Sequence, residues 1–228
     1  MKIILGIVFI IISYVLAAQN YFEYWNNGKL KVEGTVMNSQ RNGIFTYYFK
    51  SGEKELQAEY IKDTLNGKFV EWYEGGQLKT LGYYRKGQHD SKWQYWSKNG
   101  QILTLEYYVD RIPDDYWYKW YKNWNLKEKV LFVAGKLEGK WLSYYKSGEL
   151  HIEAHCSNNF WDGKWIEYYK NGNKRKEVVY DMGEMISFPK HWWSNGKVDD
   201  TPYEQIELQK QLRKEYEYEN AVILEEVE

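Results

Sequence analysis

The sequence predicts an all-β protein: an elongated single-layer antiparallel meander of about seven β-hairpin repeats of 24 residues, followed by a C-terminal helix. Three observations support this fold class. Aromatic residues make up 19% of the 228 residues, including 23 Tyr and 12 Trp, and aromatic side chains favour pleated, half-buried surfaces. A motif of glycine, aromatic residues and a second glycine recurs every 24 residues without insertion or deletion. Glycine is too frequent in this motif for stable helices, and each period has room for two short strands and their turns.

The first 18 residues are predicted to be a signal peptide. Lys2 gives a positive start, residues 3–16 are an apolar run, and the small residues Ala17 and Ala18 follow. The run is too short to span a bilayer comfortably, and this order of charge, apolar core and small residues is typical of a cleaved export signal. An uncleaved N-terminal anchor is the alternative. Cleavage predicts a protein exported to the periplasm, the cell surface or the medium, with no stable membrane span after the signal is removed.

Residues 19–198 form the predicted repeat domain. In its clearest repeat, a first strand covers residues 164–169, a turn follows at residues 170–172, and a more polar second strand covers residues 174–180. Asn-Gly in such a turn is a strong hairpin signal because both residues tolerate positive φ, so we expect this turn to be the tight one. A longer turn, such as residues 62–67, then leads to the next repeat. The turn glycines are Gly28, Gly52, Gly76, Gly100, Gly148, Gly172 and Gly196.

Aromatic residues fill fixed positions of the repeat. The first column holds Phe45, Phe69, Trp93, Trp117, Trp141 and Trp165. The second column lies three residues later, and six of its members form the predicted binding face: Trp72, Trp96, Trp120, Tyr144, Tyr168 and Trp192. The next residue is usually aromatic as well, and consecutive residues of a regular strand point to opposite faces. Either both faces carry aromatic columns, or a bulge turns the pair to one side; we expect one strongly aromatic face and a thinner second one.

Two regions depart from the repeat. Trp124 replaces a turn glycine and Pro113 precedes that repeat, so residues 111–126 are the expected place for a kink or a lost hairpin. Residues 199–228 are the predicted helical tail, partly disordered. Pro202 suits the start of a helix, and the apolar residues Ile206, Leu212 and Tyr216 are roughly in step with a helical period.

The sequence contains no convincing catalytic or metal site. The charge of −1 is made of interspersed acids and bases, which does not favour nucleic acid, and a single cysteine, Cys156, excludes a Cys-pair metal motif. His151 and His155 would lie roughly 13 Å apart on a strand, and His155 and Cys156 would point to opposite faces, so Cys156 is predicted to pack. Glu71 and Glu167 share a column that holds unrelated residues elsewhere, which predicts a solvated face rather than an acid–base pair. We therefore predict no enzyme activity, no cofactor and no metal.

The clearest repeats carry a pattern that resembles a known family. Residues 139–150 are Gly-Lys-Trp-Leu-Ser-Tyr-Tyr-Lys-Ser-Gly-Glu-Leu, and residues 67–78 are Gly-Lys-Phe-Val-Glu-Trp-Tyr-Glu-Gly-Gly-Gln-Leu. This pattern resembles the bacterial MORN-repeat-variant family and extends from about Tyr21 to Lys197. The resemblance implies tandem hairpins in an elongated single-layer sheet, a scaffold or binding role, and no catalytic residue. The names of some bacterial members imply an antitoxin-like role, which fits poorly with the predicted signal peptide.

These observations predict a non-enzymatic exported scaffold that binds a protein partner through an aromatic sheet face. The alternatives are an envelope module that binds a polysaccharide through the same rings, and an antitoxin-like protein that neutralises a partner. We expect specific function where the repeat is broken, at residues 113–124, at residues 151–156 or in the tail.

Overall fold

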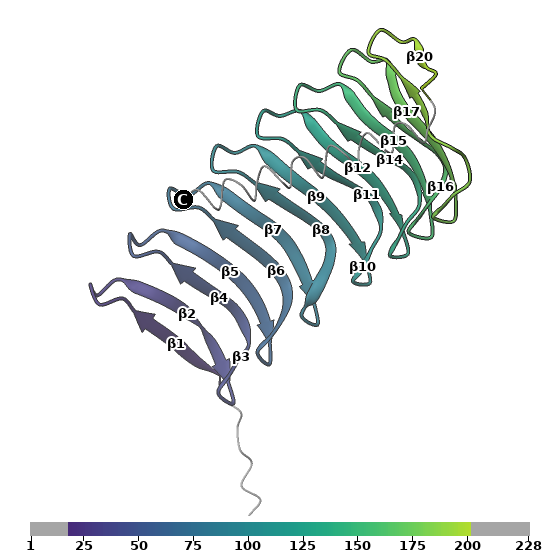
Figure 1. Cartoon of the computed structure of the whole chain (residues 1–228). Helices are drawn as coiled ribbons and strands as arrows, with labels where there is room; N and C mark the ends of the chain where they lie inside the picture. The colour runs from purple at the N-terminus through teal and green to yellow at the C-terminus, as the bar shows by residue number, and fades with distance from the viewer. Residues whose placement is uncertain (1–17, 202–228) are drawn as a thin grey trace, which may run out of the picture. The chain divides into compact units, whose positions relative to one another are not determined.

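The computed structural model describes residues 18–201, which divide after His89 into two compact units. Unit 1 ends at His89 and unit 2 begins at Asp90. Both consist of strands joined by turns, and no helix occurs among residues 18–201 (Figure 1). Accordingly, the described part contains no helix that could cross a membrane. The predicted all-β class is confirmed, whereas the predicted signal peptide and tail helix lie outside the described residues, apart from Ala18 and residues 199–201.

Unit 1 is an antiparallel sheet in which each long strand pairs with the next one along the chain. The short strand β3 extends the pairing of β2 near its end. The strands are β1 (Gln19–Tyr24), β2 (Leu30–Met37), β3 (Gln40–Arg41), β4 (Gly43–Tyr48), β5 (Lys54–Ile61), β6 (Thr64–Trp72) and β7 (Leu78–Arg85).

Unit 2 repeats the same arrangement, and its first strand, β8 (Gln88–Trp96), begins just before the boundary. All of its pairings that we describe are antiparallel. The other strands are β9 (Ile102–Val109), β10 (Ile112–Pro113), β11 (Asp115–Trp120), β12 (Leu126–Val133), β13 (Lys136–Leu137), β14 (Gly139–Tyr144), β15 (Leu150–Ser157), β16 (Phe160–Tyr168), β17 (Lys174–Asp181), β18 (Glu184–Met185), β19 (Lys190–Trp192) and β20 (Val198–Asp199). Each unit is thus a single-layer meander, as predicted.

The turns that contain the repeat glycines are three-residue loops, which we call the wide turns. At Tyr169, the backbone N–H donates to the Asn173 carbonyl (2.8 Å) and the Gly172 N–H donates to the Tyr169 carbonyl (2.9 Å). The same two hydrogen bonds recur every 24 residues from Trp25 to Trp193. Gly172 has φ +85°, but Asn171 is not among the residues with positive φ. The turn predicted at residues 170–172 is therefore confirmed in its position. It is a three-residue loop rather than a tight turn, and it needs positive φ at its third residue alone.

The opposite ends of the hairpins carry two-residue turns, which we call the tight turns. Both central residues have positive φ, for example Asn158 (51°) and Asn159 (73°), or Lys86 (50°) and Gly87 (78°). This geometry matches the right-handed twist of the paired strands. The turn that we expected to be longer is therefore the shorter one.

The buried residues gather mainly on one face of each unit, which we call the core face. In unit 1 it carries the cluster of Val32, Phe45, Ala58 and Tyr60. In unit 2, Ala154 lies between Trp141 and Trp165 on the neighbouring strands. Large rings therefore alternate with small residues on successive strands. Each ring covers the small residue beside it, so the core face is packed without a second layer of strands or helices. A fully buried ring of this kind contributes about 1.5–3 kcal/mol.

The two aromatic columns lie on opposite faces. Within β16, Trp165 is opposite Val178, and Tyr168, three residues later, is opposite Lys174. An odd spacing within a strand places two side chains on different faces, so the first column lies on the core face and the second on the other, which we call the ladder face. Both faces therefore carry aromatic columns, which is the first of the two alternatives that the sequence left open.

The hairpin of residues 111–126 is intact. β11 and β12 pair in the same register as other hairpins, with Trp117 opposite Val130 and Trp120 opposite Leu126. Trp124 adopts φ 73° and makes the hydrogen bond of the glycine that it replaces, to the Tyr121 carbonyl (3.0 Å). The expected loss of this hairpin is wrong because the strand pairing on either side holds Trp124 in the left-handed region.

Candidate functional site

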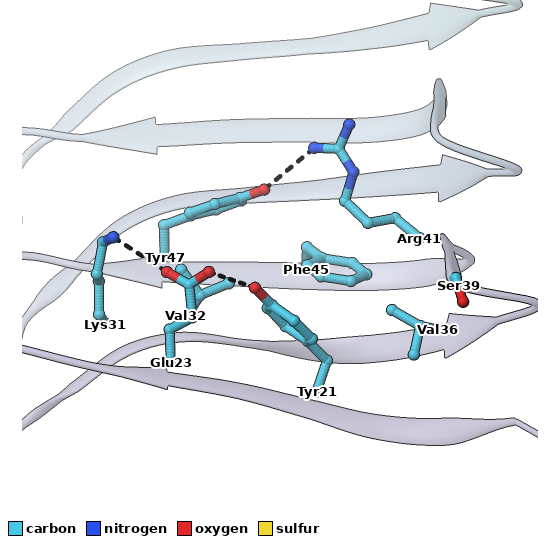
Figure 2. Close-up of a pocket in the computed structure, with 9 residues that line it drawn as sticks. All are labelled: Tyr21, Glu23, Lys31, Val32, Val36, Ser39, Arg41, Phe45 and Tyr47. Atoms are coloured by element: carbon cyan, nitrogen blue, oxygen red, sulfur yellow. Dashed lines mark hydrogen bonds and ion pairs between the residues drawn. The ribbon is translucent and has the colours of Figure 1, made fainter.

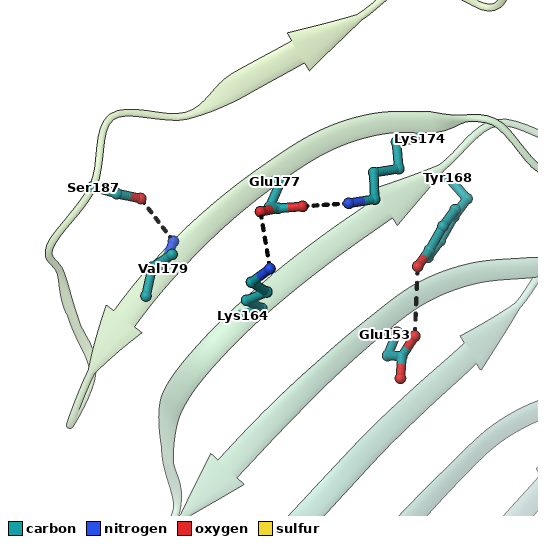
Figure 3. A network of polar contacts seen from close by, with 7 residues as sticks. All are labelled: Glu153, Lys164, Tyr168, Lys174, Glu177, Val179 and Ser187. Carbon is teal, nitrogen blue, oxygen red and sulfur yellow. Dashed lines mark hydrogen bonds and ion pairs between the residues drawn. The ribbon is translucent and has the colours of Figure 1, made fainter. Parts of the chain in front are cut away.

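The predicted binding face is half-buried in the structure. Its members end the first strand of each hairpin on the ladder face: Trp72 in unit 1, and Trp96, Trp120, Tyr144, Tyr168 and Trp192 in unit 2. Some of these rings already have partners. The Tyr168 hydroxyl donates to Glu153 (3.5 Å), beside the ion pairs that Glu177 makes with Lys164 (3.6 Å) and Lys174 (2.5 Å), as Figure 3 shows. The column is therefore partly structural.

The backbone of the same column accepts hydrogen bonds from the preceding repeat. The Tyr145 hydroxyl donates to the Tyr168 carbonyl (2.7 Å), and the Tyr169 hydroxyl donates to the Trp192 carbonyl (2.9 Å). Corresponding bonds join Tyr121 to Tyr144 (2.9 Å) and, in unit 1, the indole N–H of Trp25 to Tyr48 (3.0 Å). We call these bonds the ring ladder. They explain why aromatic residues with a polar tip occupy the position after the second column.

An aromatic row on β11 is the strongest candidate for a binding surface. Tyr116, Tyr118 and Trp120 lie on the ladder face at every second residue, with ring centroids 6.2 Å and 5.7 Å apart. The Lys129 ammonium lies 4.0 Å from the Tyr116 ring centroid and 5.6 Å from that of Tyr118. The row therefore offers three rings and a cation on adjacent strands. Tyrosine and tryptophan are enriched among the anchoring residues of protein interfaces.

The sequence contains a signal for this row. Tyr, Tyr and Trp at positions 116, 118 and 120 alternate with other residues, which is the period of one strand face. Only Trp120 belongs to the predicted binding face. Counting columns at 24 residues compares repeats with one another and does not reveal a row within one repeat.

A hollow of about 390 Å³ opens on the core face of unit 1 (Figure 2). The rings of Tyr21, Phe45 and Tyr47 line it. At its rim the Tyr21 hydroxyl donates to Glu23, which also pairs with Lys31 (3.0 Å). These polar groups satisfy one another, and they lower the pKa of the Glu23 carboxyl, first through the Tyr21 hydroxyl and then through Lys31.

Unit 2 has a hollow of about 230 Å³ at the equivalent place four repeats later. Trp117 and Trp141 stand where unit 1 has Tyr21 and Phe45, and Lys119 stands where unit 1 has Glu23. Lys119 pairs with Glu128 (2.8 Å). The hollow is thus a property of the repeat, while the charge at its rim differs between the two copies.

The residues weighed for chemistry have structural roles. Cys156 is buried and lies between Gly139 and Trp161 on the adjacent strands, whereas His155 is exposed. Burial raises the pKa of the Cys156 thiol to about 11, so it is protonated at neutral pH. His151 lies 3.5 Å from Glu167 and its ring packs on that of Tyr145 (4.2 Å between centroids). The prediction that Cys156 packs is confirmed.

Glu71 and Glu167 are less exposed than predicted. Their side chains expose 27% and 17%, and they pair with Lys79 (2.6 Å) and Arg175 (2.9 Å) respectively. The prediction of a solvated face is wrong for these two residues because bulges in the partner strands bring a basic side chain over each carboxylate. Across residues 18–201, no group of three His, Cys, Asp or Glu side chains is arranged to hold a metal ion.

Comparison with known families finds the MORN repeat variant in four places, at residues 20–38, 65–86, 137–158 and 161–182. Each match covers parts of one hairpin of the sheets described above. No curated protein matches the chain.

Proposed function

Because the chain belongs to the MORN repeat variant family, we propose that it is a non-enzymatic scaffold that binds a protein partner through the aromatic row on β11. The observation that carries this proposal is the row itself, in which Tyr116, Tyr118 and Trp120 lie side by side on one strand of the ladder face. In most other hairpins, a lysine and a smaller side chain stand where this strand has its two tyrosines. An aromatic surface of this kind anchors a partner by burying ring area around a few polar contacts.

Photo-crosslinking in the native host tests the proposal. A photoreactive residue at position 118 should capture a discrete protein, and the same residue at position 22, on the ladder face of β1, should not. Replacing Tyr116, Tyr118 and Trp120 together by Thr should abolish binding of the captured protein to the purified chain. Threonine retains the strand preference of the replaced residues, and circular dichroism checks the fold. Equal binding by the wild type and the Thr variant would refute a role for the row.

A control variant replaces three exposed aromatic residues elsewhere, Phe22, Tyr24 and Trp193, which expose 50%, 61% and 55%. It removes a similar ring area without touching β11. Binding should persist in this variant. Loss of binding in the control as well would indicate a general effect of surface rings rather than a site.

A polysaccharide ligand is the second candidate, because three rings in line along one strand could stack on consecutive sugars. Calorimetric titration with cell-wall and surface polysaccharides distinguishes the two. A heat of binding that the wild type shows and the Thr variant lacks would favour the glycan. No heat of binding with the wild type would favour the protein partner.

We also propose export, on the evidence of the apolar residues 3–16 followed by Ala17 and Ala18. Fractionation of the native host and the mass of the recovered protein test it. A chain in the cytoplasmic fraction that retains residues 1–18 would contradict the proposal. A chain in the membrane fraction that retains them would indicate the uncleaved anchor.

A further inference from the structure

An apolar strip runs along the tight-turn edge of unit 2. It consists of Val109, Ile112, Val133, Phe160 and Ile186, whose exposed fractions range from 46% to 61%. These residues lie on successive tight turns, which stack on one another: the Gly135 N–H donates to the Pro113 carbonyl (2.8 Å) and the Gly183 N–H to the Trp161 carbonyl (2.8 Å). A row of exposed apolar side chains on stacked turns marks an interaction surface.

The chain leaves the described residues beside one end of this strip. β20 is antiparallel to β19, with His191 opposite Asp199 and Trp192 opposite Val198. The same register places Thr201 level with Pro189, so the chain is heading toward the tight-turn edge where Ile186 lies. Thr201, the last described residue, therefore lies on the side of β19 that leads toward Ile186.

The segment and unit 2 carry small net charges of opposite sign. Residues 203–220 contain five glutamates and three basic residues, a formal charge of −2. Residues 90–201 contain 17 basic and 16 acidic residues, a formal charge of +1. Net charge therefore does not oppose an association of the two, and length and pattern decide it.

The segment is also complementary in length and pattern. Leu208, Leu212 and Tyr216 recur at every fourth position, which places them on one face of the helix that the sequence predicts. A helix over residues 203–220 would measure roughly 27 Å. Three repeats of two strands each, from Ile186 to Ile112, span roughly 29 Å of sheet.

We propose that residues 203–220 dock lengthwise on the apolar strip of unit 2 in the same chain, with Leu208, Leu212 and Tyr216 against the strip. The docked segment covers apolar turns that would otherwise favour association with other molecules. The docking is argued from the turn edge alone, so the proposal does not depend on the proposed function.

Hydroxyl-radical footprinting of the full chain tests this docking, because it measures the exposure of individual side chains by mass spectrometry. Phe160 and Ile186 report on the strip, and Met37 on β2 of unit 1 is the internal reference. In a variant with Leu208→Glu, Leu212→Glu and Tyr216→Glu, the oxidation of Phe160 and Ile186 should rise several-fold while that of Met37 stays constant. Equal oxidation of the strip in the wild type and this variant would overturn the proposal.

A charge-matched control replaces Gln205, Gln209 and Gln211 by Glu. It adds the same three negative charges but keeps the apolar side chains, so the strip should remain shielded. Loss of shielding in this control would mean that added charge, and not the loss of apolar contacts, exposes the strip, and it would overturn the proposal. If the shielding disappears when the wild-type protein is diluted, the segment that covers the strip belongs to a second copy of the chain. That result would overturn docking within one chain.

Discussion

Single residues in left-handed backbone show where the sheet depends on geometry rather than on side-chain chemistry. Trp124 has φ 73° in a position that glycine occupies in the other wide turns, and its ring is 61% exposed. Ser91 and Asp115 have φ 57° and 60° at a position that is glycine in four other repeats, at Gly43, Gly67, Gly139 and Gly163. A residue with a Cβ in this region costs about 1–3 kcal/mol, which the neighbouring strand pairs must offset.

We predict that Trp124→Gly stabilises unit 2. The exposed ring contributes little packing, whereas glycine relieves the backbone strain; after allowance for the greater freedom of glycine in the unfolded chain, the gain should be about 1 kcal/mol. Urea unfolding measures it. Gly172→Ala is the control for the backbone effect, because a Cβ at Gly172 would meet nothing within 4 Å, and it should destabilise. A less stable Trp124→Gly variant would show that the ring packs usefully.

The pH dependence of stability should reveal the half-buried carboxylate of Glu106. Burial raises its pKa, although the Tyr108 hydroxyl donates to it (3.1 Å) and opposes the shift. Between the unfolded pKa of about 4.3 and the raised folded pKa, the native state binds more protons than the unfolded state, so this group makes stability fall as pH rises. Glu106→Gln should therefore be more stable than the wild type at pH 7, and the difference should shrink below pH 4.

The control for this prediction has the opposite sign. The pKa of Glu149 is lowered, first by the hydrogen bond from Ser147 and then by its own backbone N–H, so its stabilising effect is present above the unfolded pKa and is lost as pH falls. Glu149→Gln should be less stable than the wild type at pH 7. Urea unfolding of both variants at pH 4 and pH 7 gives the comparison, and a shift of the same sign in both would contradict it.

Among the elements, several features recur every second hairpin, so the structural period is 48 residues where the sequence motif shows 24. Glycine is the second tight-turn residue at Gly87, Gly135 and Gly183, and the turns between them hold other residues. The side chain of Ile112 lies against Gly135, and that of Phe160 against Gly183. The ion pair Glu71–Lys79 of unit 1 repeats Glu23–Lys31 two hairpins later. The repeating structural unit is thus a pair of neighbouring hairpins.

The ring ladder should stabilise the contact between successive hairpins. Tyr145→Phe and Tyr169→Phe each remove one hydroxyl-to-carbonyl bond (2.7 Å and 2.9 Å) and keep the ring. Each substitution should lower the unfolding free energy by about 0.5–1.5 kcal/mol, and the double variant should lower it by nearly the sum. Tyr24→Phe, whose ring is 61% exposed, is the control and should change little. A negligible effect of both substitutions in urea unfolding would mean that water replaces these bonds.

The hairpins could be predicted from the sequence because their determinants are local. Glycines at Gly28 and Gly52 mark wide turns, and alternating aromatic residues mark the strands. The turn types could not be predicted, because Asn171-Gly172 suits a two-residue turn as well as a three-residue loop, and strand pairing decides between them. The bulge opposite Tyr168 lies in the partner strand β17, so β16 keeps its alternation and its aromatic columns lie on both faces. A column count does not reveal in which strand a bulge lies. The row at Tyr116 was missed for the related reason that it lies within one repeat.

At the scale of the whole molecule, each unit has its own core face, and its large rings pack on residues of the adjacent strand or of the next strand beyond it. Phe45 of unit 1 is 1% exposed, with ring centroids 5.9 Å from Tyr21 and 5.6 Å from Tyr60. Trp93 of unit 2 is also 1% exposed. Because each repeat contacts only nearby repeats, the free energy of unfolding should be close to a sum of contributions from single repeats and their interfaces. A local defect should therefore have little effect on distant repeats.

Phe45→Ala tests this prediction, because it should cost about 3–5 kcal/mol at a site where the backbone cannot close the space left by the ring. Hydrogen exchange of the full chain, followed by mass spectrometry, should show faster exchange in β2, β4 and β5, with little change in β16 and β17. Phe22→Ala is the control, because that ring is 50% exposed and its loss should leave exchange unaltered. Equally faster exchange in both units would instead mean that the sheet opens as one cooperative unit, since only global unfolding exposes distant amides together.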